Sequence, residues 1–442
     1  MNPLLMLKIF TIATCFSLYG CLKKPDPPPD RHLFLPVEAG SAPRAEKSLM
    51  NLNVKVLNSK LVRINPAILN EASDPNQNWP PFIVNLGFVE SYEATTSRYE
   101  KVTDQVVIWG SGGKGSVRIA VEKSVSGGLI AVNKRRFSLH PTNEKGVYQL
   151  LEVDPAEELE APNDFVTVPR MSDWKPQDTV STTLCDSRKV GTPPVGKGAR
   201  PSIMFLWTPA ARVWLENENP KRSVQSEIAF IFDNLRYATS SSPNFRVYPR
   251  IIHAQEIPHV EFNPGSTLVD LDALRNGQIS DVHSLRNTHK ADLVTLIGHY
   301  PKAKECGMGY MVEDASPAAA ANGYNVVNVD VEGNSYCNLP NTGVHELGHN
   351  FGMRHDRANA GNGSLSFNYG YISVKGELRS VMAYSNECGR LGIECPRIPV
   401  FSNPYYALGK FVDVMGVAAD QPNAAHNMEI LCRNAGIIER YR

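Results

Sequence analysis

The chain has 442 residues, enough for two or three domains. Lysine and arginine together number 45, as do aspartate and glutamate, so no global positive field favours nucleic acid as a partner. Hydrophobic residues make up 42% of the chain, the proportion of an ordinary globular protein that can bury a core.

The N-terminus, residues 1–20, is typical of a bacterial export signal, because its apolar run at 9–18 is too short to span a bilayer. The sequence LYGC at 18–21 resembles a lipobox, with Cys21 as the lipidated first residue of the mature chain, although its tyrosine is bulky for that motif. A Pro-rich tether follows in residues 21–50. We therefore predict an exported protein, lipid-anchored in the bacterial cell envelope at the outer membrane or cell surface; the alternative is a secreted protein with Cys21 unmodified.

Residues 51–155 are predicted to form an antiparallel β-domain, because short apolar runs such as FIVNLGFV, SVRIAVE and VYQLLEV alternate with turn residues. Gly110, Gly112 and Gly115 match the dinucleotide fingerprint G-x-G-x-x-G. The segment after them alternates like a strand and does not open a helix, so we expect these glycines in a hairpin turn.

Residues 156–200 are acidic at first and then Pro/Gly-rich and basic, without sustained periodicity, which predicts a linker. Arg188-Lys189 and Arg200 are candidate cleavage points for releasing a pro-segment. The alternative is that these basic residues are simply solvated.

Residues 201–442 are predicted to form an α+β domain. A helix is expected from Val224 to Leu235, where apolar residues recur on one face. Further helices are expected near 284–291 and 422–433. The predicted strands are SIMFLW, FRVYPRII, LVTLIG and YNVVNVD.

The stretch HELGHNFGMRHD at 345–356 contains the candidate metal ligands and the candidate catalytic base. On a helix, His345 and His349 lie one above the other and can aim two imidazoles at one metal ion. Glu346 lies about 100° round the helix, where it suits a base better than a ligand. Gly352 can end the helix with positive φ and return His355 towards the same point. Three imidazoles with one open position form a catalytic zinc site.

Six fixed positions of this kind would match by chance with a probability on the order of 10⁻⁵. The pattern H-E-x-x-H-x-x-G-x-x-H resembles the signature of metzincin zinc endopeptidases. The sequence SVMAY at 380–384 resembles their methionine turn, with Met382 under the zinc. Asp356 resembles the reprolysin (adamalysin-like) branch, where this aspartate supports the floor of the site. Tyr384 instead resembles astacins and serralysins, so it is a candidate ligand or oxyanion donor, or else a subsite wall.

This resemblance covers roughly residues 200–442 and implies a twisted mixed sheet with an active-site helix and a C-terminal helix. It implies that YNVVNVD is the edge strand along which a substrate lies. The region from WGSGGKGSVRIAV to YQLLEVD is similar, diffusely, to the propeptide-like region that precedes such catalytic domains.

Six cysteines remain after the signal, an even number that indicates disulfides in an exported chain. We pair Cys306 with Cys337, which flank the strand leading to the zinc helix, and Cys388 with Cys395, which bracket a short loop. Cys185 is expected to join the remaining cysteine, at 432. The alternative is a free Cys185 thiolate that ligates the zinc in a latent form.

The predicted function is zinc-dependent hydrolysis of peptide bonds in proteins or peptides, with zinc activating a water and Glu346 as its general base. The β-domain would then be a pro-segment. A second hypothesis is a surface adhesin or binding protein on a latent or inactive protease scaffold. A third, a hydrolase of cell-wall peptides, has no glycan-binding module to support it.

Overall fold

The computed structural model describes residues 31–37, 56–72, 81–102, 105–112, 115–121, 125–132, 135–142, 144–153, 164–167, 198–217, 222–240, 247–330, 337–361, 363, 365–407 and 414–442. The predicted signal peptide, Cys21, Cys185 and the basic pair at 188–189 lie outside these residues. Within the described part of the chain, no helix combines the length and apolar character that crossing a bilayer requires.

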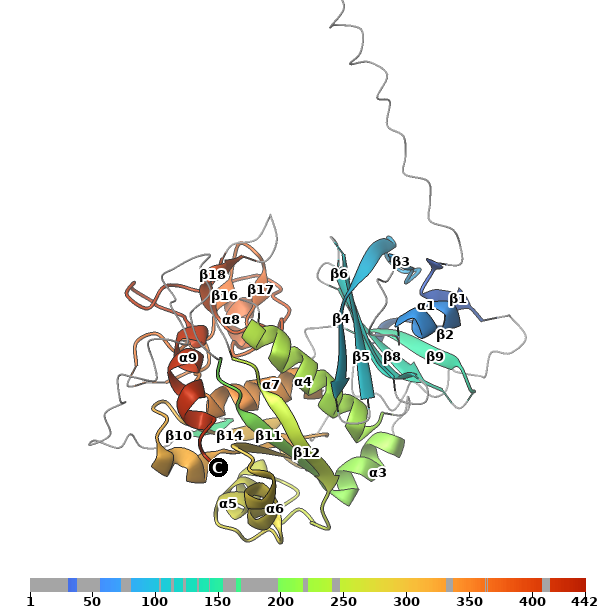
Figure 1. Ribbon diagram of the computed structural model, residues 1–442. Helices are drawn as coiled ribbons and strands as arrows, with labels where there is room; N and C mark the ends of the chain where they lie inside the picture. Colours follow the sequence, from blue (N-terminus) through green and yellow to red (C-terminus); the bar gives the residue numbers. More distant parts are fainter. Residues whose placement is uncertain are drawn as a thin grey trace, which may run out of the picture.

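The N-terminal β-domain is a nine-stranded antiparallel sheet in the order β1-β2-β9-β8-β7-β6-β5-β4-β3 (Figure 1). Its elements are β1 (Phe34–Pro36), β2 (Val56–Ile64), α1 (Pro66–Ala72), β3 (Phe82–Val84), β4 (Tyr92–Val102), β5 (Gln105–Gly112), β6 (Gly115–Val121), β7 (Val125–Val132), β8 (Arg135–Pro141) and β9 (Val147–Val153). The prediction of an antiparallel β-domain is confirmed.

The first and last strands of this sheet, β1 and β3, come together. Just before β1, the Leu33 amide donates to the carbonyl of Ile83 in β3 at 2.8 Å, beside a bridge between His32 and Ile83. Gly112 pairs with Gly115 across the β5–β6 hairpin, so the hairpin prediction for these glycines is confirmed. The tether prediction is wrong for residues 34–36, which pair with β2. Their apolar residues add to the β-domain core, where Phe34 is 2% exposed.

The C-terminal domain is α+β, with a mixed six-stranded sheet in the order β10-β14-β15-β13-β11-β12. Its strands are β10 (Phe165–Thr167), β11 (Ser202–Trp207), β12 (Arg250–Glu256), β13 (Leu293–Gly298), β14 (Gly307–Met311) and β15 (Tyr324–Asn328), with small two-stranded sheets from β16 (Ile372–Ser373), β17 (Leu378–Arg379), β18 (Asn403–Ala407) and β19 (Val414–Met415). The helices are α3 (Pro209–Asn217), α4 (Val224–Ser240), α5 (Thr267–Arg275), α6 (Val282–His289), the 3₁₀ helix η6 (Pro317–Asn322), α7 (Leu339–Asn350), α8 (Ser385–Arg390) and α9 (Asn427–Ile438).

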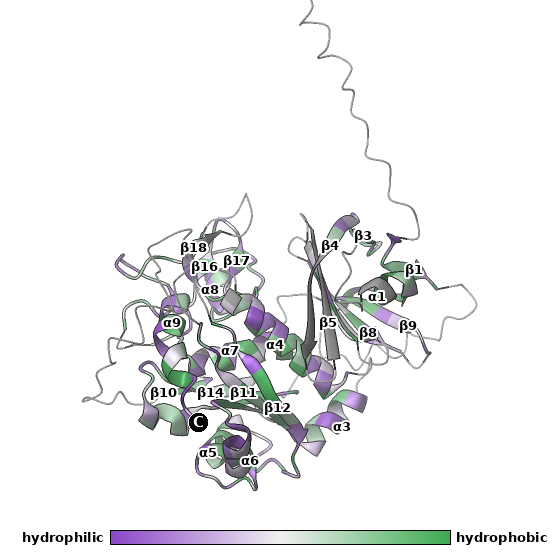
Figure 2. Ribbon diagram, viewed as in Figure 1, coloured by the Kyte–Doolittle hydropathy of each residue, from purple (hydrophilic) through white to green (hydrophobic). Residues whose placement is uncertain are grey.

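Strand β11 shows how the layers form. Because successive strand residues point to opposite faces, Phe205 packs into the core shared with α4, α7 and α9, whereas Leu206 packs into the core shared with α5 and α6. Helix α4 is amphipathic and shows both hydrophobic and hydrophilic residues in Figure 2. It lies between α7 and the β-domain, where Arg118 of β6 reaches Asp233 of α4 at 3.4 Å.

Four predictions that concern this domain need correction. Of the strand expected at 245–252, the structure describes residues 247–252, and among these β12 begins at Arg250, because Pro249 has no amide to donate to the ladder. The last helix begins five residues later than expected, at Asn427. The linker prediction is wrong for residues 165–167, which form β10 in the sheet. YNVVNVD was predicted to be an edge strand; Tyr324–Asn328 does form strand β15, but the edge position is wrong, because β14 lies beyond β15 and pairs with β10.

Candidate metal centre

Helix α7 holds the first half of the site, and all twelve of its residues are buried. The Asn338 side chain caps its N-terminus by accepting from the Asn341 amide, with Pro340 in the first turn. Gly348 lets α7 approach the chain beneath it: a Cβ there would lie 2.5 Å from the Met382 Sδ. The sequence therefore fixes the helix in close contact with the turn at 380–384.

The three predicted ligand histidines converge. The Nε2 atoms of His345 and His355 lie 3.0 Å apart. The Nε2 atom of His349 lies 3.1 Å from each of them. Tetrahedral geometry with Zn–N bonds of about 2.0–2.1 Å requires N–N separations of about 3.3 Å, close to this triangle. The structure therefore brings together the three residues that the sequence predicted as ligands.

Hydrogen bonds on the far side of two rings set their tautomers. Nδ1 of His345 lies 2.9 Å from the Val381 carbonyl, and Nδ1 of His349 lies 2.9 Å from the Met353 carbonyl. A carbonyl only accepts, so each Nδ1 carries the proton and each Nε2 presents a lone pair to its neighbours. Burial lowers the pKa of these histidines, which favours the neutral form that binds metal.

Gly352 makes the return of His355 possible. Its φ is +94°, and a Cβ would lie 2.6 Å from both the Asn434 Nδ2 and the Val312 carbonyl oxygen. The Asn368 side chain donates to the Gly352 carbonyl at 2.8 Å. Only glycine fits this turn, as the sequence predicted.

A fourth side chain, which the sequence did not predict, reaches the three histidines. Asp164, just before β10, places its carboxylate 2.7 Å from the His355 Nε2, 3.2 Å from the His345 Nε2 and 3.4 Å from the His349 Nε2. The ligand atoms of the four residues all lie within 4.8 Å of one another. The only signal in the sequence was the short run FVTV after it, which has the β-branched and aromatic residues of a strand.

These contacts fit a metal cation. Three Nε2 lone pairs and two carboxylate oxygens all accept, and the Asp164 Oδ1 has no hydrogen-bond donor among the described residues despite its 2.7 Å separation from His355. Buried acceptors facing one another repel unless a cation lies between them. The donor set of three imidazoles and one carboxylate suits zinc.

The electrostatics of the carboxylates agree with this arrangement. Burial alone would raise the pKa of Asp164, but the histidines outweigh it and hold that pKa well below its ordinary value. Burial raises the pKa of Glu346 well above its ordinary value, and the negative charge of Asp164 adds to the effect. The Glu346 Oε2 has no hydrogen-bond partner among the described residues.

Glycines of β14 make room for the predicted base. A Cβ on Gly307 would lie 2.7 Å from the Glu346 Oε1, and a Cβ on Gly309 would lie 3.0 Å from the Glu346 carbonyl oxygen. These two glycines, in the sequence GMG, were not singled out by the sequence analysis. They allow the Glu346 carboxylate to lie directly against the strand next to β10.

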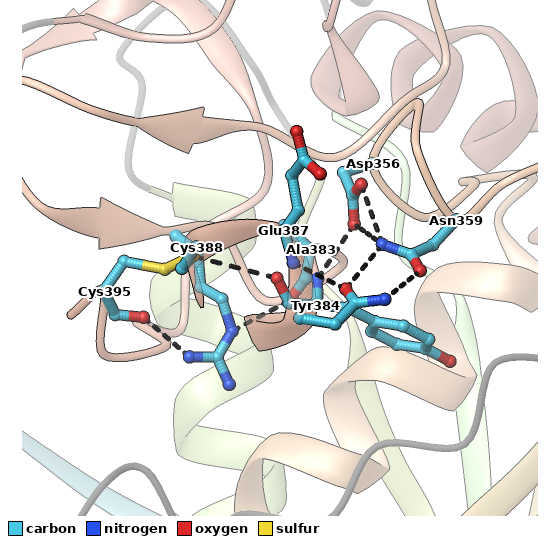
Figure 3. The surroundings of a disulfide bond; sticks show 9 residues. Asp356, Asn359, Ala383, Tyr384, Glu387, Cys388 and Cys395 are labelled. Atoms are coloured by element: carbon cyan, nitrogen blue, oxygen red, sulfur yellow. Dashed lines mark hydrogen bonds between the residues drawn. A yellow bond between two sulfur atoms is a disulfide. The ribbon is translucent and has the colours of Figure 1, made fainter. Parts of the chain in front are cut away.

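Asp356 and Tyr384 are joined by a hydrogen bond from the Tyr384 amide, beside the Cys388–Cys395 disulfide (Figure 3). The Asp356 Oδ2 accepts from the Tyr384 amide at 2.9 Å and from the Asn359 side chain at 2.9 Å, and so ties the start of α8 to the segment after His355. The Tyr384 hydroxyl donates to the Asp164 Oδ2 at 2.5 Å and lies 3.1 Å from the His355 Nε2. Tyr384 thus reaches the ligand cluster.

Two disulfides match the predicted pairs. Cys306 is bonded to Cys337 with Cα atoms 5.3 Å apart, and Cys388 is bonded to Cys395 with Cα atoms 6.0 Å apart. Cys432 is also disulfide-bonded. Its predicted partner at 185 lies outside the described residues, so that pairing stays a prediction.

Comparison with known proteins finds a similarity to metallopeptidases. Residues 247–407 match the family described as Metallo-peptidase family M12B Reprolysin-like. The peptidyl-Asp metalloendopeptidase of Pseudomonas aeruginosa is 31% identical over 224 residues, which are 46% of this chain and 34% of that protein. The chain therefore spans about a third of the length of this curated relative.

Two solved structures are similar at a lower level. One, titled as a chaperone–substrate complex, has a TM-score of 0.42 and 16% identity and covers 75% of this chain and 56% of its own. The other, metalloproteinase-II from Bacteroides fragilis, has a TM-score of 0.41 and 9% identity and covers 65% of this chain and 84% of its own. TM-scores below 0.5 do not establish a shared fold.

Proposed function

Because the chain contains a metzincin-like metallopeptidase domain, we propose that it is a zinc metalloendopeptidase that hydrolyses peptide bonds in proteins or peptides. The observation that carries this proposal is the convergence of three imidazole Nε2 atoms within 3.0–3.1 Å of one another, beside a buried glutamate. His345, His349 and His355 would hold the zinc.

When bound, zinc supplies a Lewis acid that polarises the scissile carbonyl and lowers the pKa of water to about 7. Glu346 is the proposed general base: it accepts a proton from the attacking water and passes it to the leaving amine. The raised pKa of its carboxyl, caused mainly by burial, suits a group that must take up and then release a proton near neutral pH.

Tyr384 is proposed to stabilise negative charge that develops on the scissile carbonyl oxygen. Its hydroxyl already lies at the ligand cluster, 3.1 Å from the His355 Nε2, and it donates to a carboxylate oxygen there. A donor in that position is suited to an oxyanion. Asp356 would act as a positioning residue, because it holds the Tyr384 backbone and not the metal.

We propose a preference for aspartate beside the scissile bond. The relative from Pseudomonas aeruginosa is named for peptidyl-Asp. The positive charge of buried Arg397 acts on both Glu346 and His345. A peptide library cleaved by the enzyme tests this: a cleavage frequency at aspartate no higher than at asparagine would contradict it.

The export signal and Cys21 support the further proposal of an enzyme anchored by lipid in the bacterial cell envelope. Labelling of cells with a fatty-acid analogue tests the anchor, with Cys21→Ser as the control variant. Incorporation of label into both proteins would refute lipidation at this residue.

The activity is tested with the chain from Leu22 to Arg442, loaded with zinc and nicked by limited trypsin treatment, which is then stopped with an inhibitor. We expect it to hydrolyse an unfolded protein, and to stop when zinc is chelated. Glu346→Ala at matched zinc content is the control. If both proteins are inactive although each holds one zinc, the alternative of a binding protein on an inactive protease scaffold gains support.

A further inference from the structure

We propose that three exposed apolar side chains, on α5 and on the loop between β12 and α5, form an exosite, a surface outside the metal centre that binds a distal part of a polypeptide substrate. The exosite consists of Val260, Phe262 and Val269, with Lys302 and Lys304 beside them. Its occupant is an unfolded segment that carries apolar and acidic side chains. The inference rests on the proposed function, because it names the class of substrate that the same enzyme cleaves.

The exposure of these apolar side chains is high. Val260 is 79% exposed and Phe262 is 54% exposed, the two highest values among the exposed large hydrophobic residues that the structure describes, and Val269 is 40% exposed. The Phe262 amide donates to the Asp270 side chain at 3.2 Å, which brings the loop against the first turn of α5, where Val269 lies. Single exposed apolar side chains are ordinary, but three that lie together mark a binding surface.

The residues that alternate with Val260 and Phe262 are polar and turn inward. His259 is buried, and its Nε2 lies 3.2 Å from the Asp270 Oδ2. The Glu261 Oε1 accepts from a hydroxyl just after β11 at 2.6 Å and from a backbone amide just after β13 at 2.8 Å. A loop that meets only water would turn its polar side chains outward, so the reverse order indicates that the apolar pair is displayed for a partner.

Buried contacts hold this display in place. Asp270 is fully buried, and its Oδ2 accepts from the Tyr300 hydroxyl at 2.6 Å while its Oδ1 accepts from the loop. The ring of Phe262 packs edge-on against that of His259, with centroids 5.0 Å apart. A proline on each side of the apolar pair restricts the backbone further. A surface that is already ordered loses little conformational entropy when a partner binds.

The exosite adjoins the end of β14 at which a bound substrate would emerge. The Lys302 amide donates to the Pro264 carbonyl at 3.0 Å. Thr267 donates to the Glu305 Oε1 through its amide at 2.9 Å and through its hydroxyl at 3.0 Å. Glu305 comes two residues before Gly307, where β14 begins. A polypeptide that pairs along β14 and extends beyond Gly307 therefore passes this turn and meets the exosite.

The charges beside the exosite favour an acidic occupant. Lys302 and Lys304 are exposed. The neighbouring carboxylates are engaged by the protein: Glu305 accepts from Thr267 and from the Lys304 amide at 3.2 Å, and Glu261 accepts from the ends of two strands. The charge that this surface presents to solvent is therefore positive, and it complements aspartate or glutamate in the occupant.

The test compares a short and a long substrate. The short one has about six residues around the cleavage site, and the long one adds about eight residues rich in phenylalanine, leucine and aspartate, about 26 Å when extended, at one end or the other. The enzyme is the zinc-loaded chain from Leu22 to Arg442, prepared as for the activity test. We expect extension at one end to raise kcat/KM. The double variant Val260→Ser, Phe262→Ser should lower kcat/KM for that substrate about tenfold, through KM, and leave the short substrate unchanged.

Two comparisons sharpen the test. Tyr248→Ser is the matched control, because Tyr248 is 43% exposed and lies just before β12, at the opposite end of that strand from the loop. This variant should cleave both substrates like the wild type. Replacing the aspartates of the extension by asparagine should raise KM about two- to fivefold, because Lys302 and Lys304 lose their partners. An equal KM would overturn the acidic part of the proposal.

The outcomes separate the exosite from the proposed activity. The exosite is overturned if the wild type gains nothing from either extension, or if the double variant loses nothing, or loses as much on the short substrate as on the long one. It is also overturned if Phe262→Ser converts a dimer to a monomer in sedimentation, which would assign the surface to a second copy of the chain. Hydrolysis of the short substrate leaves the metallopeptidase proposal intact in each case. If the wild type holds one zinc and cleaves neither substrate, that proposal fails and the exosite fails with it.

Discussion

The two edges of the six-stranded sheet are built differently. Strand β12 forms one edge, and its side chains are half-buried, with Arg250 and Glu256 exposed at its ends. Strand β14 lies at the other side, beneath β10, and all five of its residues are buried. Charged and polar residues on an edge strand discourage pairing with another strand. Strand β14 has no charged side chain, which suits a strand that is paired on both sides, with β10 and with β15.

The two sides of the sheet differ most, for function, in what pairs with them, and the strand that matters is β14. In the structure its partner at this edge is β10. In the proposed enzyme it is a substrate, because pairing along an open edge binds peptides through the main chain. The edge at β14 lies next to Glu346 and the histidines, whereas three strands, β15, β13 and β11, separate β12 from β14. Changes at the β14 edge should therefore affect catalysis, and changes at β12 should not.

The largest effect is expected from His355→Ala. In an Asp164→Asn background, which lacks the fourth candidate ligand, this variant removes one of three nitrogens that lie within 3.0–3.1 Å of each other, so the remaining two should not retain zinc. Zinc per chain, measured by elemental analysis after dialysis, should fall from one to near zero, and hydrolysis should be lost. His253→Ala, on β12, is the matched control and should keep its zinc. An undiminished zinc content in His355→Ala would remove this residue from the ligand set.

Glu346→Gln should lower turnover strongly without loss of metal. It keeps the size of the side chain against Gly307 and Gly309 but removes the carboxylate that accepts the proton. In an Asp164→Asn background, which removes the carboxylate beside the three histidines, kcat should fall by about 10²–10⁴-fold. Peptide hydrolysis and zinc content are measured on the same preparation. A kcat within a factor of two of the background would exclude Glu346 as the base.

Gly307→Ala should disrupt the packing between β14 and Glu346. The added Cβ would lie 2.8 Å from both the Glu346 Cγ and the Val326 carbonyl oxygen, so Glu346 or the backbone must move. We expect a loss of about 1–3 kcal/mol in the free energy of unfolding, and a lower kcat in the Asp164→Asn background. Gly389→Ala is the control, because nothing lies within 4 Å of its added Cβ. Equal denaturation midpoints for the two variants would contradict the tight fit at β14.

The ligand histidines could be predicted from sequence because their geometry is local. The spacing of His345 and His349 fits one helix face, and Gly352 supplies the turn that its φ of +94° now shows. Two disulfides were also predictable, since Cys388 and Cys395 are 7 residues apart and Cys306 and Cys337, 31 residues apart, flank the strand that leads to the zinc helix. Local spacing is enough when the elements that carry the residues are close in sequence.

Asp164 could not be predicted in this way. It lies 220 residues before Tyr384, to which it is hydrogen-bonded, and no local pattern encodes such a contact. The edge strand was assigned wrongly to YNVVN for a related reason. The sequence GMGYM is too rich in glycine to be recognised as a strand, yet those glycines are what admit Glu346.

The smallest effect is expected at the opposite edge. Glu256 of β12 accepts from the Arg212 guanidinium at 2.6 Å and from the Trp207 indole at 3.2 Å, but the ion pair is exposed. Glu256→Gln should therefore shift the thermal midpoint by no more than about 1 °C, because water already screens the pair. Hydrolysis in the Asp164→Asn background should stay unchanged. A fall in kcat comparable to that of Gly307→Ala would show that both edges of the sheet act on the site, and would remove the functional difference between them.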